Sequence, residues 1–528
     1  MRVSPGKWLR TARHLKARQW LGRLTNPLRR PFAVRPLRPG FLTLPPFSPP
    51  AQGWSADPFP KENLFKLLNR EKHFSGKVEW GFQGFGPLWH YTLNSFDWEL
   101  PAGGPEPGLN LMESFLAGLD HNPLGLDPWP TSRRIVNWIR QLERQGVDPR
   151  RRGRLAAAIK DQAYRLSHRL EYHLLGNHLV ENGLALLWAG AWLKDRRLLT
   201  RASSLLSRQL RIQILSDGGH EERSTMYHCR LLDGLLDALD LARRNRDRGI
   251  SSQLVRRIAG TADAMLGWAR ALAFRDGGLP LVNDSAPGGF PPLQFLAEKA
   301  HRLGLKGKPR QLGASGYRRL EAEGVEALID VGPPGPDHNP GHGHCDALAV
   351  IIRTGGIPLL VDPGVSAYHD PAVRMAERGT AAHNTVVVNG EEQNEIWGTF
   401  RMGRRAAVRD LEESEGLVAA AHTGYAHLGV RHHRSLAVRD REIRILDRVD
   451  GDMVSSRVAW FHFPPEMELV LENDQARWPG GEIHWRGGAA SRVAGHVSAG
   501  FNRREGAPVV RVDFSGTREL ETRILVNR

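Results

Sequence analysis

The stretch HNPGHGHCDALAVIIR, residues 338–353, marks the point where the chain changes from one kind of structure to another. Its second part, residues 348–353, is mostly apolar and partly β-branched, which predicts a buried strand. Its first part carries three histidines together with one proline and two glycines, and it predicts a loop leading into that strand. Residues two apart in an extended chain face the same side, so His342 and His344 can point into one site.

The sequence on either side of this stretch differs in its periodicity. Upstream, apolar residues recur at helical spacing between residues 109 and 303, with short breaks that are typical of antiparallel helices stacked in pairs. Downstream of residue 314, short β-type runs alternate with turn signals such as Asn389-Gly390 and Asp450-Gly451. We therefore predict an α+β multidomain fold, with a helical array followed by an antiparallel β-sandwich.

Composition limits the class of protein and of partner. At 528 residues the chain is long enough for two or three domains. Its formal charge of +16 would attract a polyanion, which could be nucleic acid, an anionic membrane or an acidic polysaccharide. We recognise no nucleic-acid-binding module in the sequence and expect no nucleic-acid partner. Two distant cysteines, Cys229 and Cys345, cannot form a disulfide framework, so a metal site would use histidine and carboxylate.

The N-terminal region is basic and then rich in proline. Residues 1–30 lack an uninterrupted apolar core, so no cleavable signal is evident, and no run approaches the length of a membrane span. We expect a protein that is cytoplasmic or peripheral to the inner membrane, with the periplasm as the alternative. Residues 8–28 could form a basic amphipathic helix on an anionic membrane. Residues 31–60 predict an extended connector.

Three further polar clusters lie in the rest of the chain. The first, NHLVENG at 177–183, is expected at a junction between helices. The second, DGGHEERSTMYH at 217–228, predicts a loop leading into a helix that Ser224 or Thr225 caps. The third, RGTAAHNT at 378–385, precedes a strand. Taken singly, each has an ordinary structural explanation. His344, Asp362 and His383 would together give a nitrogen and oxygen set suited to zinc.

Taken together, these clusters resemble the heparinase II/III family of polysaccharide lyases. The match also includes WHYTLNSFDW at 89–98 and DGGLP at 276–280, and it runs from about Trp89 to about Phe400. The resemblance implies an incomplete α/α toroid followed by a β-sandwich, with the sugar in the cleft between them. The expected division of the chain is a basic leader and connector at 1–60, the toroid at 61–313 and the sandwich at 314–528.

The resemblance also implies roles for particular residues. The expected catalytic group is Asn177, His178, Tyr227 and His342. The residues expected to hold a structural zinc are His344, Asp362 and His383. We further expect four residues to contact substrate, namely Glu181, Arg223, His228 and Trp397.

The chemistry of β-elimination agrees with these residue types. Removal of the C5 proton of a uronate requires its carboxylate to be neutralised, a task that suits Asn177 and His178. Tyr227, with a pKa lowered by surrounding positive charge, would serve as acid and could also serve as base, while His342 is the other candidate base. Which of the two abstracts the proton depends on whether the uronate is of the gluco or the ido type.

The predicted substrate is an acidic, uronate-containing glycan that is heparin-like or heparan-like, alginate-like, or the cell's own capsule or exopolysaccharide. One alternative is a non-catalytic acidic-glycan-binding protein of exopolysaccharide assembly. The presence of the whole expected catalytic group argues against it, because a pure binder has little need for that set. A second alternative is a toroid glycoside hydrolase with paired carboxylates drawn from Asp217, Glu221 and Glu222.

Overall fold

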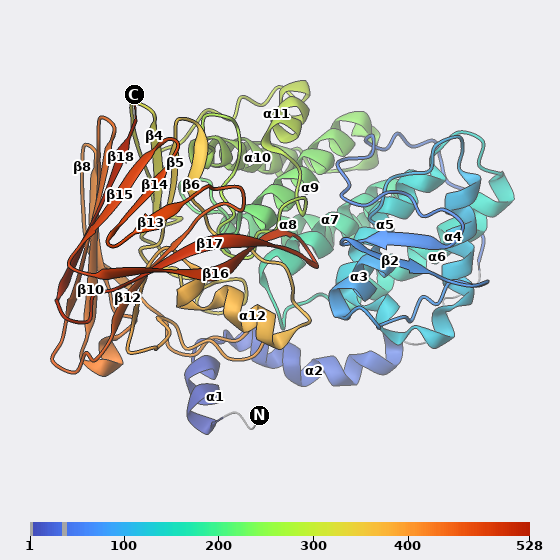
Figure 1. The fold of residues 1–528 in the computed structure, drawn as a ribbon. Helices are drawn as coiled ribbons and strands as arrows, with labels where there is room; N and C mark the ends of the chain where they lie inside the picture. Colours follow the sequence, from blue (N-terminus) through green and yellow to red (C-terminus); the bar gives the residue numbers. More distant parts are fainter. Residues whose placement is uncertain (1–3, 34–39, 528) are drawn as a thin grey trace.

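Helices fill the first part of the chain and strands the second part in the computed structural model, which describes residues 4–33 and 40–527 (Figure 1). This confirms the predicted fold class. The α-helices are α1 (Pro5–Ala12), α2 (Ala17–Ala33), α3 (Pro87–Ser95), α4 (Glu106–Ala117), α5 (Pro128–Leu142), α6 (Pro149–His168), α7 (Gly176–Leu193), α8 (Arg196–Gln213), α9 (Thr225–Arg244), α10 (Ser252–Leu272), α11 (Leu293–Arg302) and α12 (Pro371–Arg378).

Helix α7 lies at the centre of the helical array, where it contacts α5, α6, α8 and α9. Its sequence is apolar on nearly every side, as expected for a helix surrounded by other helices. Gly183 allows α8 to approach closely, because a Cβ at this position would lie 2.8 Å from a methyl group of Leu206. Large aromatic side chains such as Trp138, Trp188 and Trp268 fill the interior of the array. These tryptophans therefore serve packing.

The strands pair antiparallel within four sheets. A two-stranded sheet, β1-β2, lies beside the helices, and the other three have the orders β13-β14-β15-β18-β11-β10-β9-β8, β16-β17-β12-β7 and β3-β4-β5-β6. The strands are β1 (Leu64–Leu67), β2 (Arg70–His73), β3 (Tyr317–Ala322), β4 (Val325–Asp330), β5 (Val350–Thr354), β6 (Ile357–Leu360), β7 (Val386–Val388), β8 (Val408–Ser414), β9 (Leu417–His422), β10 (Arg431–Arg439), β11 (Glu442–Asp450), β12 (Arg457–His462), β13 (Val470–Glu472), β14 (Gln475–Trp478), β15 (Gly481–Arg486), β16 (Ala489–Gly500), β17 (Arg503–Asp513) and β18 (Glu519–Val526).

One apolar core joins the three larger sheets into a sandwich. Strands β10 and β11 bury every second residue, and their inward side chains, such as Leu436 and Ile445, pack with Ile352 of β5 and Val512 of β17. The alternation follows from the two-residue repeat of an extended chain with one face against the core.

The position of the cluster at 177–183 differs from the prediction. The cluster at 177–183 lies within the first two turns of α7 and not between two helices, because Gly176 already begins the helix. Glu222, from the loop before α9, stabilises this helix start by accepting a hydrogen bond from the backbone N–H of Asn177. Ser224 caps α9, as expected, by accepting a hydrogen bond from the N–H of Tyr227.

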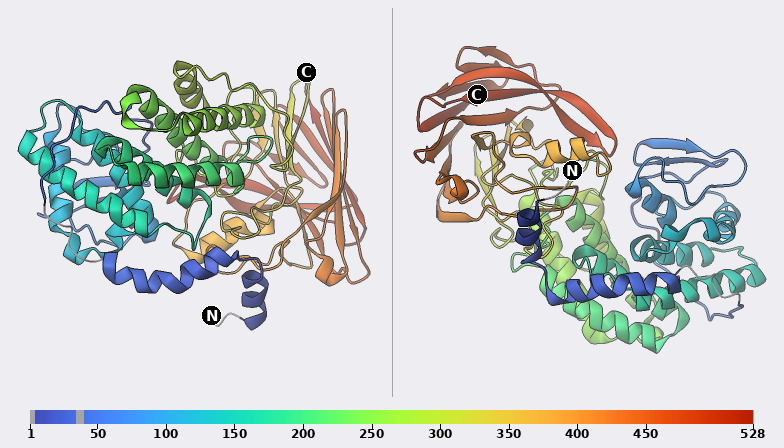
Figure 2. Two further views of the ribbon diagram at one scale, coloured as in Figure 1. Left: turned by 180° about the vertical axis from the view of Figure 1, so that it is seen from behind. Right: turned by 90° about the horizontal axis from the view of Figure 1, so that it is seen from below.

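The region predicted as one helix over residues 8–28 forms two helices, α1 and α2. They run along the outside of the molecule, beneath both the helical array and the strand region (Figures 1 and 2). After them, residues 40–60 follow an extended path with almost no regular structure. Of the rest of the predicted connector, residues 31–33 belong to α2 and residues 34–39 lie outside the described residues. Within the described ranges, no helix combines the length and the apolar character needed to cross a membrane.

Candidate active site

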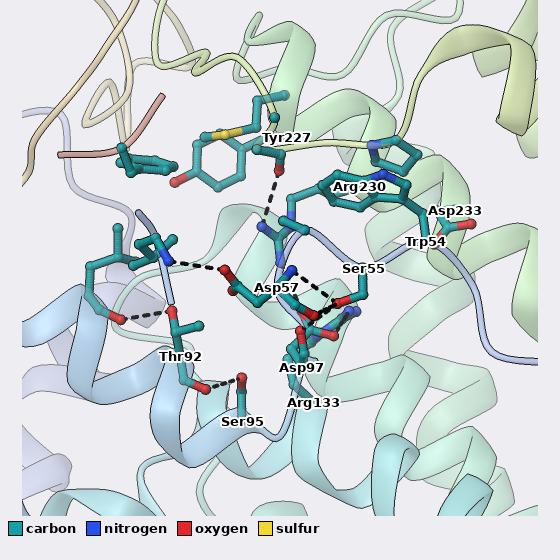
Figure 3. Close-up of a pocket in the computed structure, with 18 of the residues that line it drawn as sticks. Trp54, Ser55, Asp57, Thr92, Ser95, Asp97, Arg133, Tyr227, Arg230 and Asp233 are labelled. Carbon is teal, nitrogen blue, oxygen red and sulfur yellow. Dashed lines mark hydrogen bonds and ion pairs between the residues drawn. The ribbon is translucent and has the colours of Figure 1, made fainter. Parts of the chain in front are cut away.

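A pocket of about 290 Å³ lies between the helical array and the strand region (Figure 3). The connector, α3, α5, α7 and α9 supply most of its wall, and the second half of the chain supplies Tyr368, Ala499 and Phe501. Three residues expected at the site line this pocket: Asn177, Glu181 and Tyr227. Both halves must therefore fold and pack together before the pocket exists.

Tyr227 lies in the first turn of α9 and meets residues of the second half of the chain. Its ring centroid lies 4.1 Å from that of His342, and its hydroxyl lies 3.2 Å from the hydroxyl of Tyr368. Burial raises the pKa of the Tyr227 phenol well above its usual value, and the charge of Asp284 raises it further. The expectation of a lowered pKa is therefore wrong, because dehydration and a nearby carboxylate outweigh the effect of Arg230. A phenol with a raised pKa stays protonated at neutral pH and can donate a proton.

Asp284 fixes the orientation of His342. The Nδ1 atom of His342 lies 2.7 Å from Oδ2 of Asp284, which leaves Nε2 as the ring nitrogen available to a reactant. Although burial raises the pKa of Asp284, the charge of Arg374 and hydrogen bonds from two histidines hold it well below its usual range. An ionised Asp284 favours the His342 tautomer with the proton on Nδ1, so that Nε2 carries a lone pair and can accept a proton.

Asn177 and His178 begin α7 and face different acidic partners. The side-chain amide of Asn177 donates to Oε2 of Glu222 at 2.6 Å, and this holds the amide at the pocket wall. The Nδ1 atom of His178 lies 3.0 Å from Oε1 of Glu171, and its ring does not line the pocket. Burial lowers the pKa of His178, but the charge and hydrogen bond of Glu171, together with the charges of Glu222 and Glu181, outweigh burial, so the pKa is raised overall. His178 therefore carries positive charge more readily than an ordinary histidine.

An acidic residue at the base of the pocket was not identified from the sequence. Asp97 accepts hydrogen bonds from Arg133 at 2.7 Å and from Arg230 at 3.0 Å (Figure 3). Arg133 also pairs with Glu181 at 3.5 Å, which places the expected substrate-binding Glu181 in the same network. Asp97 falls within the WHYTLNSFDW motif, but its two arginine partners lie 36 and 133 positions away. Spacing along the chain therefore gave no signal for this cluster.

The pocket wall carries both signs of charge. Its acidic and basic residues are Arg133, Arg230, Asp57, Asp97, Glu181 and Asp233. Burial raises the pKa of Asp57 to about 6. The positive charge of the whole molecule is therefore not concentrated in this pocket, and recognition of an anionic group here depends on individual arginines and hydrogen-bond donors.

Three of the expected substrate-contacting residues lie away from the pocket wall. Arg223 is buried and donates to backbone carbonyl oxygens, including that of Ser315 at 2.9 Å. His228 is fully buried against Trp268, with Nε2 3.0 Å from the carbonyl oxygen of Met265. Trp397 donates its indole N–H to Thr11 of α1. We correct the expectation for Arg223 and His228, because both side chains are enclosed by packing and bonded to backbone, which serves to position the loop before α9.

The three residues expected to hold zinc lie near one another. The Nδ1 atom of His383 is 2.7 Å from Oδ2 of Asp362, and the rings of His344 and His383 are 5.2 Å apart between centroids. His344 Nδ1 and His383 Nε2 are buried and have no hydrogen-bond partner among the described residues. In the described part of the chain, however, no three His, Cys, Asp or Glu side chains are already arranged as a metal-binding group.

The sequence matches a known family over most of its length. Residues 145–290 match the heparinase II/III N-terminus, and residues 305–524 match the heparinase II/III-like C-terminal domain. The first matched segment falls on the helical array and the second on the strand region. The chain therefore belongs to the heparinase II/III-like family of polysaccharide lyases, which confirms the resemblance found in the sequence motifs.

Two solved structures share the fold, and one curated protein is similar in sequence. The fold is similar to the crystal structure of heparinase III, with a TM-score of 0.67 and 16% identity over 86% of this chain and 80% of that chain. It is also similar to a mutant of heparan sulfate lyase HepC from Pedobacter heparinus, with a TM-score of 0.59 and 16% identity over 96% and 88% of the two chains. FtsZ-localized protein C of Caulobacter vibrioides (strain NA1000 / CB15N) is 28% identical over 424 residues, 72% of this chain and 70% of that protein.

Proposed function

We propose that this protein cleaves an acidic, uronate-containing glycan by β-elimination, with Tyr227 and His342 as the proton-transfer groups. The observation that carries the proposal is their contact, 4.1 Å between ring centroids: Tyr227 lines the pocket between the two halves of the chain, and His342 packs against its ring without lining the pocket itself. The two groups have complementary properties, since the Tyr227 phenol has a raised pKa and Asp284 orients the imidazole of His342. One can donate a proton while the other accepts one.

The proposed reaction uses His342 as base and Tyr227 as acid. His342 Nε2 takes the C5 proton of the uronate, and the electron pair of the C5–H bond forms the C4–C5 double bond. The C4–O4 bond breaks, and Tyr227 gives its proton to the departing O4. Asp284 stabilises the imidazolium that forms on His342. Each proton and electron pair is thereby accounted for, and the product is unsaturated at its new non-reducing end.

Two kinds of group are available to neutralise the uronate carboxylate. The amide of Asn177 lies at the pocket wall, and one of its two N–H donors is already directed to Glu222. Arg230 lies three residues after Tyr227 on α9, so both side chains project from the same face of the helix into the pocket. Hydrogen bonds from such donors acidify the C5 proton by stabilising the negative charge that develops when it leaves.

The decisive experiment is incubation with a panel of uronate glycans. We expect an unsaturated product that absorbs in the ultraviolet, because elimination leaves a C4–C5 double bond and hydrolysis does not. The panel would include heparan sulfate, hyaluronan, alginate and the acidic polymers of the source cell. Saturated fragments would indicate the hydrolase alternative, and binding without cleavage of any polymer would indicate the glycan-binding alternative.

We also propose that His344, Asp362 and His383 hold a structural zinc ion. The two unpartnered imidazole nitrogens and the carboxylate of Asp362 are the donor types that zinc prefers. The three residues come from three separate loops of the second half. His344 lies before β5, Asp362 follows β6, and His383 lies before β7. A bound zinc would hold these three loops together and would therefore stabilise the folded protein.

Metal analysis tests this site directly. We expect about one zinc per chain in the purified protein, and we expect His344→Ala to lower metal content and melting temperature together. His228→Ala is the matched control, because His228 is also fully buried but lies outside the proposed ligand set. It should lower stability without loss of metal. A metal-free wild-type protein, or equal metal content in both variants, would overturn the assignment.

A further inference from the structure

The N-terminal helices expose an apolar surface. Among the described side chains of α1 and α2, five large apolar ones are exposed, and we call them the N-terminal apolar patch: Trp8, Leu9, Trp20, Leu21 and Leu24. Leu9 is 62% exposed and Leu24 is 71% exposed. The rings of Trp8 and Trp20 touch edge to face, with centroids 6.0 Å apart, so the apolar residues of the two helices adjoin. Large apolar side chains gathered in this way on a soluble domain generally mark a contact surface.

The patch belongs to helices that are fixed to the body of the protein. On α1, Arg10 pairs with Glu395, and Thr11 accepts a hydrogen bond from the indole N–H of Trp397 at 3.0 Å. On α2, the side chain of Gln19 donates to the carbonyl oxygen of His338 at 3.0 Å. The patch is therefore presented in one orientation, on the two helices that Figure 2 shows lying across the underside of the molecule.

On α2 the attached face and the apolar face lie on opposite sides. Gln19 is buried, and Gly22 packs so closely that a Cβ there would lie 2.8 Å from the backbone nitrogen of His173. At about 100° per residue, Trp20, Leu21 and Leu24 project from the side of the helix opposite these two residues. The body of this protein therefore cannot cover the apolar face.

The surroundings of the patch are basic. Residues 1–33 contain nine Lys and Arg residues and no Asp or Glu, and the first acidic residue of the chain is Asp57. Arg13, Lys16 and Arg18 are exposed beside the patch. Apolar and tryptophan side chains next to lysine and arginine match an anionic lipid surface, where rings enter the headgroup region and cations meet phosphates. A second basic copy of this chain would instead be repelled at short range.

We infer that α1 and α2 dock this protein on the surface of a bilayer that contains anionic phospholipid. Docking is peripheral, since the two helices lie along the surface and the apolar side chains enter only the interfacial layer. Gln19 contacts the loop that carries His342, so the membrane lies on the side of the molecule next to that loop. This inference does not depend on the proposed lyase reaction and can hold whether or not that reaction is found.

Co-sedimentation of the full chain with vesicles tests the inference. We expect binding to phosphatidylcholine vesicles with about 30% phosphatidylglycerol, and at least about tenfold weaker binding to phosphatidylcholine alone. Two variants should each weaken binding to the anionic vesicles by at least about tenfold: a patch variant, Trp8→Ser with Leu21→Ser and Leu24→Ser, and a charge variant, Arg13→Glu with Lys16→Glu and Arg18→Glu.

The control variant carries three substitutions at exposed apolar residues of the second half: Ile357→Ser, Met453→Ser and Val470→Ser. It should bind vesicles like the wild type, and unchanged melting temperatures would show that all variants are folded. Failure of the wild type to bind anionic vesicles would overturn the inference, as would binding by the patch and charge variants that is as tight as that of the wild type. A wild-type dimer that the patch variant abolishes, without vesicle binding, would instead assign the patch to self-association.

Discussion

We expect Tyr227→Phe to reduce turnover about a hundred- to ten-thousandfold, the usual contribution of a general acid, while the protein remains folded. The substitution removes one oxygen and keeps the ring packed against His342. The lost hydroxyl interacts with the hydroxyl of Tyr368, so the loss in free energy of unfolding should be about 1 kcal/mol. Initial rates of formation of the ultraviolet-absorbing product and a thermal melt would measure the two effects.

Two further tyrosine variants make this experiment specific. Tyr368→Phe removes the partner hydroxyl but keeps the proposed proton donor, so turnover should fall less than about tenfold. Tyr172→Phe should stay fully active, because Tyr172 lies in the turn between α6 and α7, where its ring contacts Arg18. Near wild-type turnover in Tyr227→Phe would exclude the phenol as the acid and would move that role to His342 or His178.

We expect Asp284→Asn to lower the free energy of unfolding by about 3–5 kcal/mol, the range found when one partner of a buried ion pair is removed. Asp284 and Arg374 are both fully buried, and Arg374 Nη2 lies 2.7 Å from Asp284 Oδ2. Asparagine keeps the shape of the side chain but leaves the guanidinium without a neutralising charge. The substitution also weakens the hydrogen bond between Asp284 and Nδ1 of His342 that orients the imidazole ring, so turnover should fall as well. Urea denaturation measured by circular dichroism would give the stability change.

The matched control for this substitution is Asp276→Asn. Asp276 also pairs with an arginine, Arg353, at 2.6 Å, but its side chain is 50% exposed. Water screens this pair, so its loss should change the free energy of unfolding by less than about 1 kcal/mol. Equal losses in the two variants would show that burial does not set the energy of the Asp284 pair.

The residues that proved easiest to find from the sequence were those in compact motifs. Tyr227 follows a capped polar loop, and His342 precedes a strand in a glycine-rich loop, so each was recognisable from its neighbours. The groups that act on them were harder to assign. Tyr368, Asp284 and Arg374 lie far along the chain from Tyr227 or His342, and none has a distinctive local pattern that predicts its partner. Contacts at long sequence separation depend on how whole elements pack.

The sequence by itself determined the order of helices and strands, because the repeats of 3.6 and two residues are properties of the local backbone. It also identified the motifs of the family. Only the tertiary structure decided the charge states and the contacts of the site. The pKa of Tyr227 was predicted to be lowered by surrounding positive charge, whereas burial and Asp284 raise it. Arg223 and His228 likewise belong to the polar segment 217–228, which suggested substrate contact, but their side chains are enclosed by packing. Hydration and the distances between charges depend on atoms brought together from the whole chain, and a local pattern carries no information about them.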